Sequence, residues 1–176
     1  MPEPLPRWLI LDRDGVLNAD RPDHVLTPDQ FQPLPGAFEA LARFTRAGVR
    51  LAVATNQSAV GRGWLSVAGL AAIHARLLHA ADRAGARIEA IAFCPHAPDA
   101  GCACRKPAPG LLLTLARCLK FDPRDAWFAG DQPRDLAAAR AAGLRGIAIG
   151  PALTDADAPH FADLPALAAH CLGPGA

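Results

Sequence analysis

Short apolar runs alternate with longer amphipathic segments along most of this chain, and this alternation limits the possible folds more than any other feature. The apolar runs have the length of buried strands, and they lie at residues 8–11, 50–54, 90–93, 126–129 and 146–149. Segments with helical periodicity lie between them, near residues 36–47, 66–84, 108–120 and 134–142. Strands that alternate with helices predict an α/β fold, with a central parallel sheet and helices on both faces.

The length of the chain suits one hydrophobic core. Of the 176 residues, 51% are apolar, and the composition does not change along the chain. We therefore expect a single domain over residues 1–176, present as a monomer.

The charge pattern favours a small partner over a macromolecular one. The net charge is +1 and the basic residues are scattered, so nothing indicates binding to nucleic acid or to an anionic membrane. No apolar run reaches the roughly 18 residues of a membrane span, and the first residues lack the pattern of a secretory signal. We expect a soluble, cytoplasmic protein.

Polar residues follow several of the predicted strands directly. Asp12 and Asp14 follow the first strand, Thr55 follows the second, and Asp131 follows the strand at 126–129. The loop 94–107 follows another. Because the carboxyl ends of parallel strands meet at one edge of a sheet, we expect these residues to converge there. Any one of them is equally explained as a helix cap, so it is the coincidence that indicates a site.

Asp12 and Asp14 are two residues apart at the end of an apolar run. On a strand, such positions share one face, so the two carboxylates would repel each other. A bound cation, a shared proton or a turn at Gly15 would relieve the repulsion. Each of these remedies points to a functional site.

Three of the five cysteines lie between residues 94 and 104, and this crowding favours a metal site over a disulfide framework. The candidate ligands are Cys94, His96, Cys102 and Cys104. Three thiolates and one imidazole complete a tetrahedral zinc site with no open position, which predicts a structural ion that pins the loop. Reduced thiols without a metal are the alternative. Cys118 and Cys171 lie in helical apolar patterns, and we expect both to pack in the core.

Four segments, taken in chain order, resemble the motif set of the haloacid dehalogenase superfamily of aspartate-nucleophile phosphatases. They are Asp12-Arg13-Asp14-Gly15-Val16, Thr55-Asn56-Gln57-Ser58, Arg105-Lys106-Pro107, and Gly130-Asp131 with Asp135. The cysteine loop is similar to the zinc loop of the D-glycero-D-manno-heptose 1,7-bisphosphate phosphatases and of the related histidinol-phosphate phosphatases. The resemblance implies a Rossmann-like fold, and the short connections of this chain leave no room for a large cap domain.

The resemblance also implies a mechanism. Asp12 would attack phosphorus and form an aspartyl phosphate, while Asp14 would act as general acid and then general base. Magnesium would be held by the carboxylates of Asp12 and Asp131 and the backbone carbonyl of Asp14, with Asp135 as a further candidate ligand.

The same family pattern assigns residues to the transferring phosphoryl group. Thr55 and the backbone amides of Asn56 and Gln57 would hold its oxygens, and Lys106 would place a positive charge against it. Lys106 is notable because only two of the 18 basic residues are lysines. The competing interpretation is an ordinary surface lysine.

Substrate recognition is the remaining expectation. Arg105 and Arg62 would clamp a second phosphate, although Arg62 alone is equally well explained as a solvated loop residue. Gln132 stands where some relatives carry lysine. The candidate substrate-binding residues are Asn56, Gln57, Ser58, Arg105, Arg62, Asp20, Asp23 and Gln132.

The resemblance therefore implies a magnesium- and zinc-containing phosphatase for a small phosphorylated sugar. The first expectation is hydrolysis of the 7-phosphate of the heptose bisphosphate, a step in lipopolysaccharide precursor synthesis. Histidinol phosphate is an alternative substrate, because five residues between His96 and Cys102 form a loop short enough for that branch. A zinc-stabilised binding protein without turnover is a second alternative.

Overall fold

The computed structural model describes residues 4–151, 153 and 157–174, and it is built on one six-stranded sheet with strand order β3-β2-β1-β4-β5-β6. All adjacent strands are parallel. The strands are β1 (Trp8–Leu11), β2 (Arg50–Asn56), β3 (Ile88–Cys94), β4 (Ala126–Gly130), β5 (Arg145–Ile149) and β6 (His160–Phe161). The predicted α/β architecture is confirmed.

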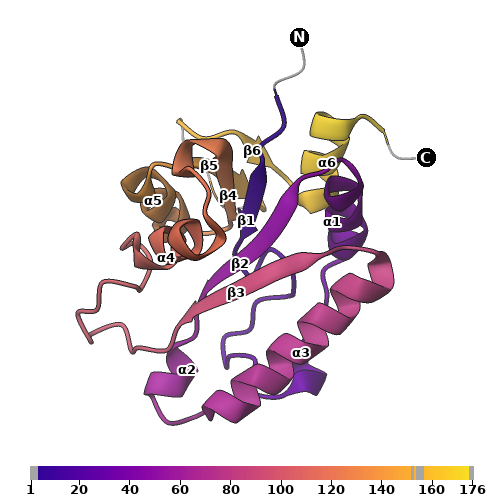
Figure 1. Cartoon of the computed structure of the whole chain (residues 1–176). Helices are drawn as coiled ribbons and strands as arrows, with labels where there is room; N and C mark the ends of the chain where they lie inside the picture. The colour runs from indigo at the N-terminus through magenta and orange to yellow at the C-terminus, as the bar shows by residue number, and fades with distance from the viewer. Residues whose placement is uncertain (1–3, 152, 154–156, 175–176) are drawn as a thin grey trace.

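Helices cover both faces of the sheet. Figure 1 shows α4 and α5 on one side and α1, α3 and α6 on the other. The helices are α1 (Ala37–Arg46), α2 (Ser58–Gly61), α3 (Val67–Ala84), α4 (Gly110–Leu119), α5 (Pro133–Ala142) and α6 (Leu164–Leu172), and single 3₁₀ turns lie at Pro28–Gln30 and Pro123–Asp125. Within the described residues, no second domain covers the carboxyl edge of the sheet. In the same part of the chain, no helix combines the length and apolar character needed to cross a membrane.

The alternation of side chains along β1 divides the interior into two cores. Leu9 and Leu11 belong to the core under α1, α3 and α6, whereas Trp8 and Ile10 belong to the core under α4 and α5. All four residues of β1 are buried, as expected for a central strand covered by helices on both sides. The short apolar runs in the sequence thus reflect strands without a solvent face.

The register of the central strands aligns their carboxyl ends. Leu11 of β1 pairs with Val53 of β2 and with Ala129 of β4. The residues that follow these strands therefore start from the same level of the sheet, which is the arrangement predicted for Asp12, Thr55 and Asp131.

The carboxyl-terminal part of the fold was not predicted. The two-residue strand β6 is too short to give an alternating pattern, and α6 lacks the polar stripe that would mark an amphipathic helix. The four-residue helix α2 is likewise too short to show a helical period.

The prediction for Cys118 was wrong. This residue is exposed on α4, while Leu112, Leu115 and Ala116 form the buried face of the same helix. Two positions beyond Ala116, a helical side chain points to a different side. Cys171 is partly buried and packs against the larger core, as expected.

Candidate active site

Polar residues from three neighbouring strands come together at the carboxyl edge, as the sequence predicted. Asp12 follows β1, Thr55 lies at the end of β2, and Asp131 follows β4. Lys106, from the loop after β3, completes the group, because its ammonium lies 2.9 Å from the Asp12 carboxylate.

Asp12 is almost fully buried, with 4% of its surface exposed. Its Oδ1 accepts a hydrogen bond from the backbone amide of Arg13 (2.7 Å) and lies 2.9 Å from Lys106 Nζ. Burial raises the pKa of Asp12 to about 7, even though the Lys106 ammonium acts in the opposite direction. A carboxylate in this environment is stabilised in its ionised form by any further cation that binds beside it.

Lys106 joins two acidic side chains inside the protein. Its Nζ lies 2.8 Å from Asp135 Oδ1 and 2.9 Å from Asp12 Oδ1, and it donates to the carbonyl of Ala54 at 3.0 Å. Burial alone would lower the pKa of Lys106, but the carboxylates of Asp12 and Asp135 outweigh that effect and raise it. Lys106 is 1% exposed, which rules out its interpretation as an ordinary surface lysine.

Three carboxylates form a group that suits a hard cation. Oxygen atoms of Asp12, Asp131 and Asp135 lie within 4.8 Å of one another. Asp131 Oδ1 is buried and has no hydrogen-bond partner among the described residues, and burial raises the pKa of this carboxyl. An unpartnered carboxylate oxygen next to other carboxylates fits the oxygen ligands that Mg²⁺ requires.

Asp135 and Gln132 brace this group from the start of α5. Asp135 is fully buried, and its Oδ2 accepts the backbone amide of Gln132 at 3.1 Å. The Gln132 side chain donates to Asp131 Oδ2 at 2.9 Å. Gln132 therefore contacts the acidic group and does not line the cavity described below.

Gly15 makes room for Asp131. A β-carbon at this position would lie 2.2 Å from Asp131 Oδ2, and the backbone has a φ of +79°, which side-chain-bearing residues rarely adopt. The turn predicted after Asp14 is therefore required both by its conformation and by the close approach of a candidate metal ligand.

A buried arginine, Arg13, binds the carboxylate of Asp14, and sequence reasoning did not single out this residue. Arg13, 1% exposed, donates from Nε and Nη2 to the two Asp14 oxygens at 3.1 and 2.9 Å. The Asp14 oxygens also accept hydrogen bonds from Asn18 Nδ2 and Gln57 Nε2, each at 2.9 Å. The available signal was the position of Arg13 in the sequence, because it is adjacent to both aspartates.

The segment at the end of β2 is tied to its surroundings by hydrogen bonds. Thr55 Oγ1 accepts from Gln57 Nε2 at 2.9 Å, and the Asn56 side chain both donates to and accepts from the backbone of Lys106, at 3.1 Å each. The backbone amide of Gln57 donates to the carbonyl of Cys94 at 2.8 Å. That amide is engaged within the protein in this structure, and its contact with a phosphoryl oxygen stays a prediction.

A polar cavity of about 280 Å³ opens above Asp12 and Asp14. Of the predicted substrate-binding residues, it is lined by Asn56, Ser58, Asp20, Arg62 and Arg105. Asp23 does not line it and instead forms an exposed ion pair with Arg21 at 2.8 Å. Four further lining residues were missed by sequence reasoning: Pro98 and the basic or imidazole side chains of Arg21, His24 and Arg134. Basic side chains in the loops that follow the strands were the available signal.

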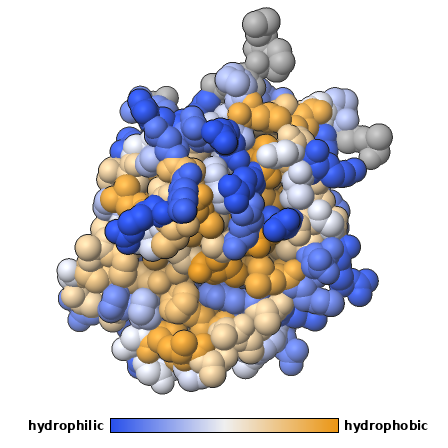
Figure 2. Space-filling view, viewed as in Figure 1, coloured by the Kyte–Doolittle hydropathy of each residue, from blue (hydrophilic) through white to orange (hydrophobic). Residues whose placement is uncertain are grey.

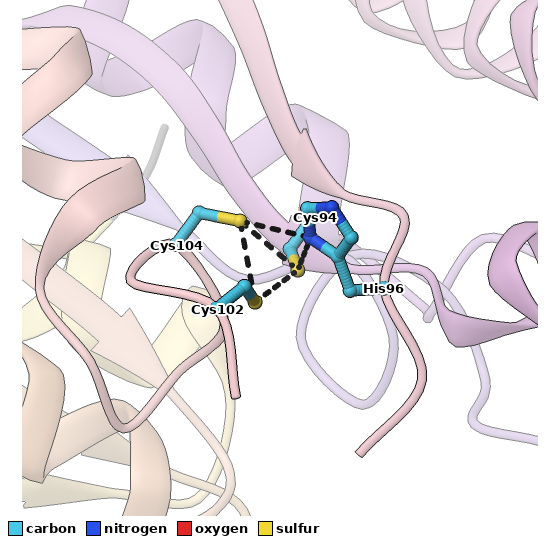
Figure 3. Close-up of side chains that lie close together, drawn as sticks. All are labelled: Cys94, His96, Cys102 and Cys104. Carbon is cyan, nitrogen blue, oxygen red and sulfur yellow. Dashed lines mark hydrogen bonds between the residues drawn. The ribbon is translucent and has the colours of Figure 1, made fainter. Parts of the chain in front are cut away.

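The predicted zinc ligands also come together (Figure 3). Cys104 Sγ lies 3.3 Å from both Cys94 Sγ and His96 Nδ1. Cys102 Sγ lies 3.6 Å from Cys94 Sγ and 3.5 Å from Cys104 Sγ. Four ligands on tetrahedral zinc, with metal–sulfur bonds of about 2.3 Å, are roughly 3.7 Å apart. The observed spacing fits such an ion to within a few tenths of an ångström.

The cysteine cluster leads directly into the active site. Cys104 is followed by Arg105, which lines the cavity, and then by the buried Lys106. Arg105 also donates from Nη1 to the carbonyl of His96 at 3.3 Å, which bridges the two halves of the loop.

The parallel sheet covered by helices on both faces, with an acidic, lysine-containing site at its carboxyl edge, is the arrangement of a phosphoric monoester hydrolase with a Rossmann-like fold, and the comparison with known families agrees. The sequence model of the haloacid dehalogenase-like hydrolase family matches residues 6–143. The chain belongs to the haloacid dehalogenase-like hydrolases.

Individual relatives within this family are named as heptose phosphatases. The chain is 48% identical to the D-glycero-β-D-manno-heptose-1,7-bisphosphate 7-phosphatase of Pseudomonas aeruginosa over 133 residues, which are 76% of this chain and 75% of the relative. The Pseudomonas putida protein of the same name is 43% identical over 143 residues, covering 81% and 82% of the two chains.

A solved structure resembles the whole fold. The D,D-heptose 1,7-bisphosphate phosphatase from Bordetella bronchiseptica, in complex with magnesium and phosphate, matches with a TM-score of 0.86 and 39% identity. The match covers 92% of this chain and 95% of that one.

Proposed function

We propose that this chain is a magnesium-dependent phosphatase that removes the 7-phosphate of D-glycero-β-D-manno-heptose 1,7-bisphosphate. The observation that carries the proposal is the convergence of Asp12, Lys106 and Asp131 beneath a polar cavity. The relatives from two Pseudomonas species and the Bordetella bronchiseptica structure support the choice of substrate.

Asp12 is the proposed nucleophile. Its Oδ1 is held by Lys106 and by the Arg13 amide, so Oδ2 is the oxygen left to attack phosphorus. As the new O–P bond forms, the bond from phosphorus to the sugar oxygen breaks, and Asp14, which enters this step in its protonated form, donates its proton to that oxygen and becomes a carboxylate. The products of this first step are the sugar with a free hydroxyl group and an aspartyl phosphate on Asp12.

Asp14 then acts as general base in the second step. It accepts a proton from a water molecule that attacks phosphorus, and the bond between phosphorus and Asp12 breaks. Inorganic phosphate leaves and both carboxyl groups return to their starting states. The hydrogen bonds from Arg13, Asn18 and Gln57 keep the Asp14 carboxylate facing the cavity throughout.

Two metal ions have separate roles in this proposal. Asp12, Asp131 and the Asp14 carbonyl would hold Mg²⁺, with Asp135 as a further candidate, and the ion would offset the repulsion between carboxylate and phosphate. The cluster of three cysteines and His96 would hold Zn²⁺ with all four positions filled, so zinc would stabilise the loop and take no part in the chemistry.

Side chains around the cavity would bind both phosphate groups of a bisphosphate. Three residues would hold the phosphoryl group that is transferred: Thr55 at the end of β2, Ser58 on the cavity wall, and Lys106, which lies 2.9 Å from Asp12. Arg62 and Arg105, which line the cavity, would bind the second phosphate through their planar guanidinium groups.

The chemistry of the cysteines favours a reducing compartment. All five are free thiols, and the cluster of three requires reduced sulfur to bind zinc. We therefore place the protein in the cytoplasm, where it would act as a single-domain monomer on a small phosphorylated sugar.

Hydrolysis of a panel of phosphoesters, with metal analysis of the purified protein, tests the proposal. The panel contains both anomers of the heptose 1,7-bisphosphate, the heptose 7-phosphate and histidinol phosphate. We expect the highest kcat/KM for the β-anomer of the bisphosphate, dependence on added Mg²⁺, and about one zinc per chain. A higher kcat/KM for histidinol phosphate would contradict the proposed substrate, and absence of turnover on every compound would favour a binding protein.

A further inference from the structure

One large aromatic side chain stands at the surface next to the cavity. Trp64 lies in the turn between α2 and α3 and is 55% exposed. The other two tryptophans, Trp8 and Trp127, are buried. In Figure 2, apolar side chains reach the surface over α2 and the start of α3, at the lower end of the view. An exposed tryptophan of this kind requires an explanation, because burial of its ring is the usual outcome.

Trp64 contacts both Arg62 and His24, and these three side chains form a group that we call the stack. The guanidinium carbon of Arg62 lies 5.0 Å from the centre of the Trp64 ring, within the range of a cation–π interaction. The His24 ring lies 5.5 Å from the Trp64 ring at an angle of 53°. The stack joins the loop after β1 to the turn after α2, two segments that are distant in the sequence.

The backbone at both ends of the stack is constrained. The Trp64 amide donates to the carbonyl of Ala59 at 2.9 Å, which closes the turn after α2. His24 has a φ of +62°, an unusual conformation for a residue with a β-carbon, and its amide donates to the Arg21 carbonyl at 3.2 Å. Both aromatic groups are thus presented by ordered turns.

Two members of the stack line the cavity and the third does not. Arg62 and His24 are lining residues, whereas Trp64 is not. Trp64 therefore reaches the cavity only through its neighbours, and its contribution is to orient them.

The charge of Arg62 is available to an anion. Arg21, on the same cavity wall, is paired with Asp23 at 2.8 Å, but no carboxylate pairs with Arg62 in the part of the chain that the structure describes. An exposed arginine populates many rotamers. Contact with an aromatic ring restricts these rotamers before a ligand binds, so that less side-chain entropy is lost on binding.

We propose that Trp64 is a positioning residue for substrate specificity: in contact with both His24 and Arg62, it holds the Arg62 guanidinium at the cavity to bind the phosphate that is not hydrolysed. This inference rests on the proposed function, and it extends that function by assigning selectivity for bisphosphates over monophosphates to a stack outside the reacting centre.

The test compares KM and kcat for the heptose 1,7-bisphosphate and the heptose 7-phosphate. Trp64→Ala should raise KM for the bisphosphate about three- to tenfold and leave kcat within twofold, with little change in KM for the monophosphate. Trp64→Phe, which keeps an aromatic face, should restore most of the lost selectivity. Arg62→Ala should raise the same KM at least as much, and adding Trp64→Ala to it should have little further effect.

Two outcomes would overturn the inference. One is an equal rise in KM for both substrates in Trp64→Ala, which would indicate a general change in the site. The other is additive effects of Trp64→Ala and Arg62→Ala, which would mean that Trp64 does not act through Arg62.

Fluorescence quenching tests the stack without any substrate. Because Trp8 and Trp127 are 2% and 8% exposed, acrylamide quenching reports mainly on Trp64. Arg62→Ala and His24→Ala should each increase the quenching constant, whereas Arg76→Ala, an exposed change on α3, should not. Failure of the wild-type protein to hydrolyse the bisphosphate would contradict the proposed function, while unchanged quenching in both stack variants would contradict the stack itself.

Discussion

The carboxylate cluster and the cysteine cluster each gather metal-ligating side chains, but they differ in how completely the protein surrounds the ion. The cysteine cluster is a closed set, in which three sulfurs and one imidazole nitrogen contact one another in a short loop. The carboxylate cluster lies beneath an open cavity, and its Asp131 Oδ1 lacks a partner among the described residues. The closed set suits an ion that holds the chain together, and the open set suits an ion that meets a substrate.

The largest expected effect comes from the open cluster. Asp12→Asn should lower kcat by about 10⁴-fold or more, because the amide has nearly the same shape but is a poor nucleophile. Steady-state rates with the bisphosphate, together with circular dichroism to show that the variant is folded, make the measurement. Asp82→Asn, an exposed change on α3, is the control. Wild-type turnover in Asp12→Asn would rule out the covalent mechanism.

A second test reduces the space available to the Asp131 side chain. Gly15→Ala should lower activity about 100-fold at limiting Mg²⁺, because the new β-carbon would lie 2.2 Å from Asp131 Oδ2 and displace it. Gly48 has a similar φ of +84° with no atom near its missing side chain, so Gly48→Ala carries the same backbone cost without the clash. Titration of the rate with Mg²⁺ compares the two. An equal loss in both variants would attribute the effect to the backbone alone.

The closed cluster should respond mainly in stability. Cys104→Ser should lower the thermal midpoint by about 5–10 °C, since 1 kcal/mol corresponds to roughly 2–4 °C in a chain of this size. Activity should fall roughly tenfold through displacement of Arg105 and Lys106. Cys118→Ser, on the exposed side of α4, is the matched control. Removal of zinc with a chelator should have the same effect, reversed by Zn²⁺; recovery with Mg²⁺ alone would contradict the assignment of the two clusters.

The smallest expected effect concerns a buried histidine on α3, His74. Burial, aided by the nearby Arg13 charge, lowers the pKa of His74 to about 4, while the Asp14 carboxylate acts in the opposite direction. The unfolded chain would bind this proton near pH 6.5, so the folded state loses stability as the pH falls from about 6.5 towards 4. His74→Phe should remove about 1–2 kcal/mol of the stability lost between pH 7 and pH 5. Urea unfolding at the two pH values measures this difference, and parallel losses in both proteins would contradict the expectation.

Sequence reasoning located the site because the site depends on strand order and strand length. The apolar runs before Asp12, Thr55 and Asp131 are buried strands with aligned registers, so their positions in the sequence translate directly into positions at one edge. The cysteine cluster was equally accessible, because its four ligands lie close together in the sequence.

Several of the features that were missed depend on contacts between distant segments. The ion pairs of Lys106 with Asp12 and Asp135 join three separate elements, and no local pattern encodes them. The stack of His24, Trp64 and Arg62 likewise joins two loops. The error at Cys118 has a different origin, because a helical period near the end of a helix does not settle which side the last residues take.

The two hydrogen bonds between the Asn56 side chain and the Lys106 backbone affect how the loop of residues 94–107 tolerates insertions. A metal ion at one end and the Asn56 side chain at the other would anchor the segment from Cys102 to Lys106. Residues 97–101 then form a loop tip, and a change in its length would not move Lys106. Insertions in that tip are therefore expected to reshape the rim of the cavity while the ammonium group stays beside Asp12, which makes the tip a natural place to redesign substrate choice without rebuilding the chemistry.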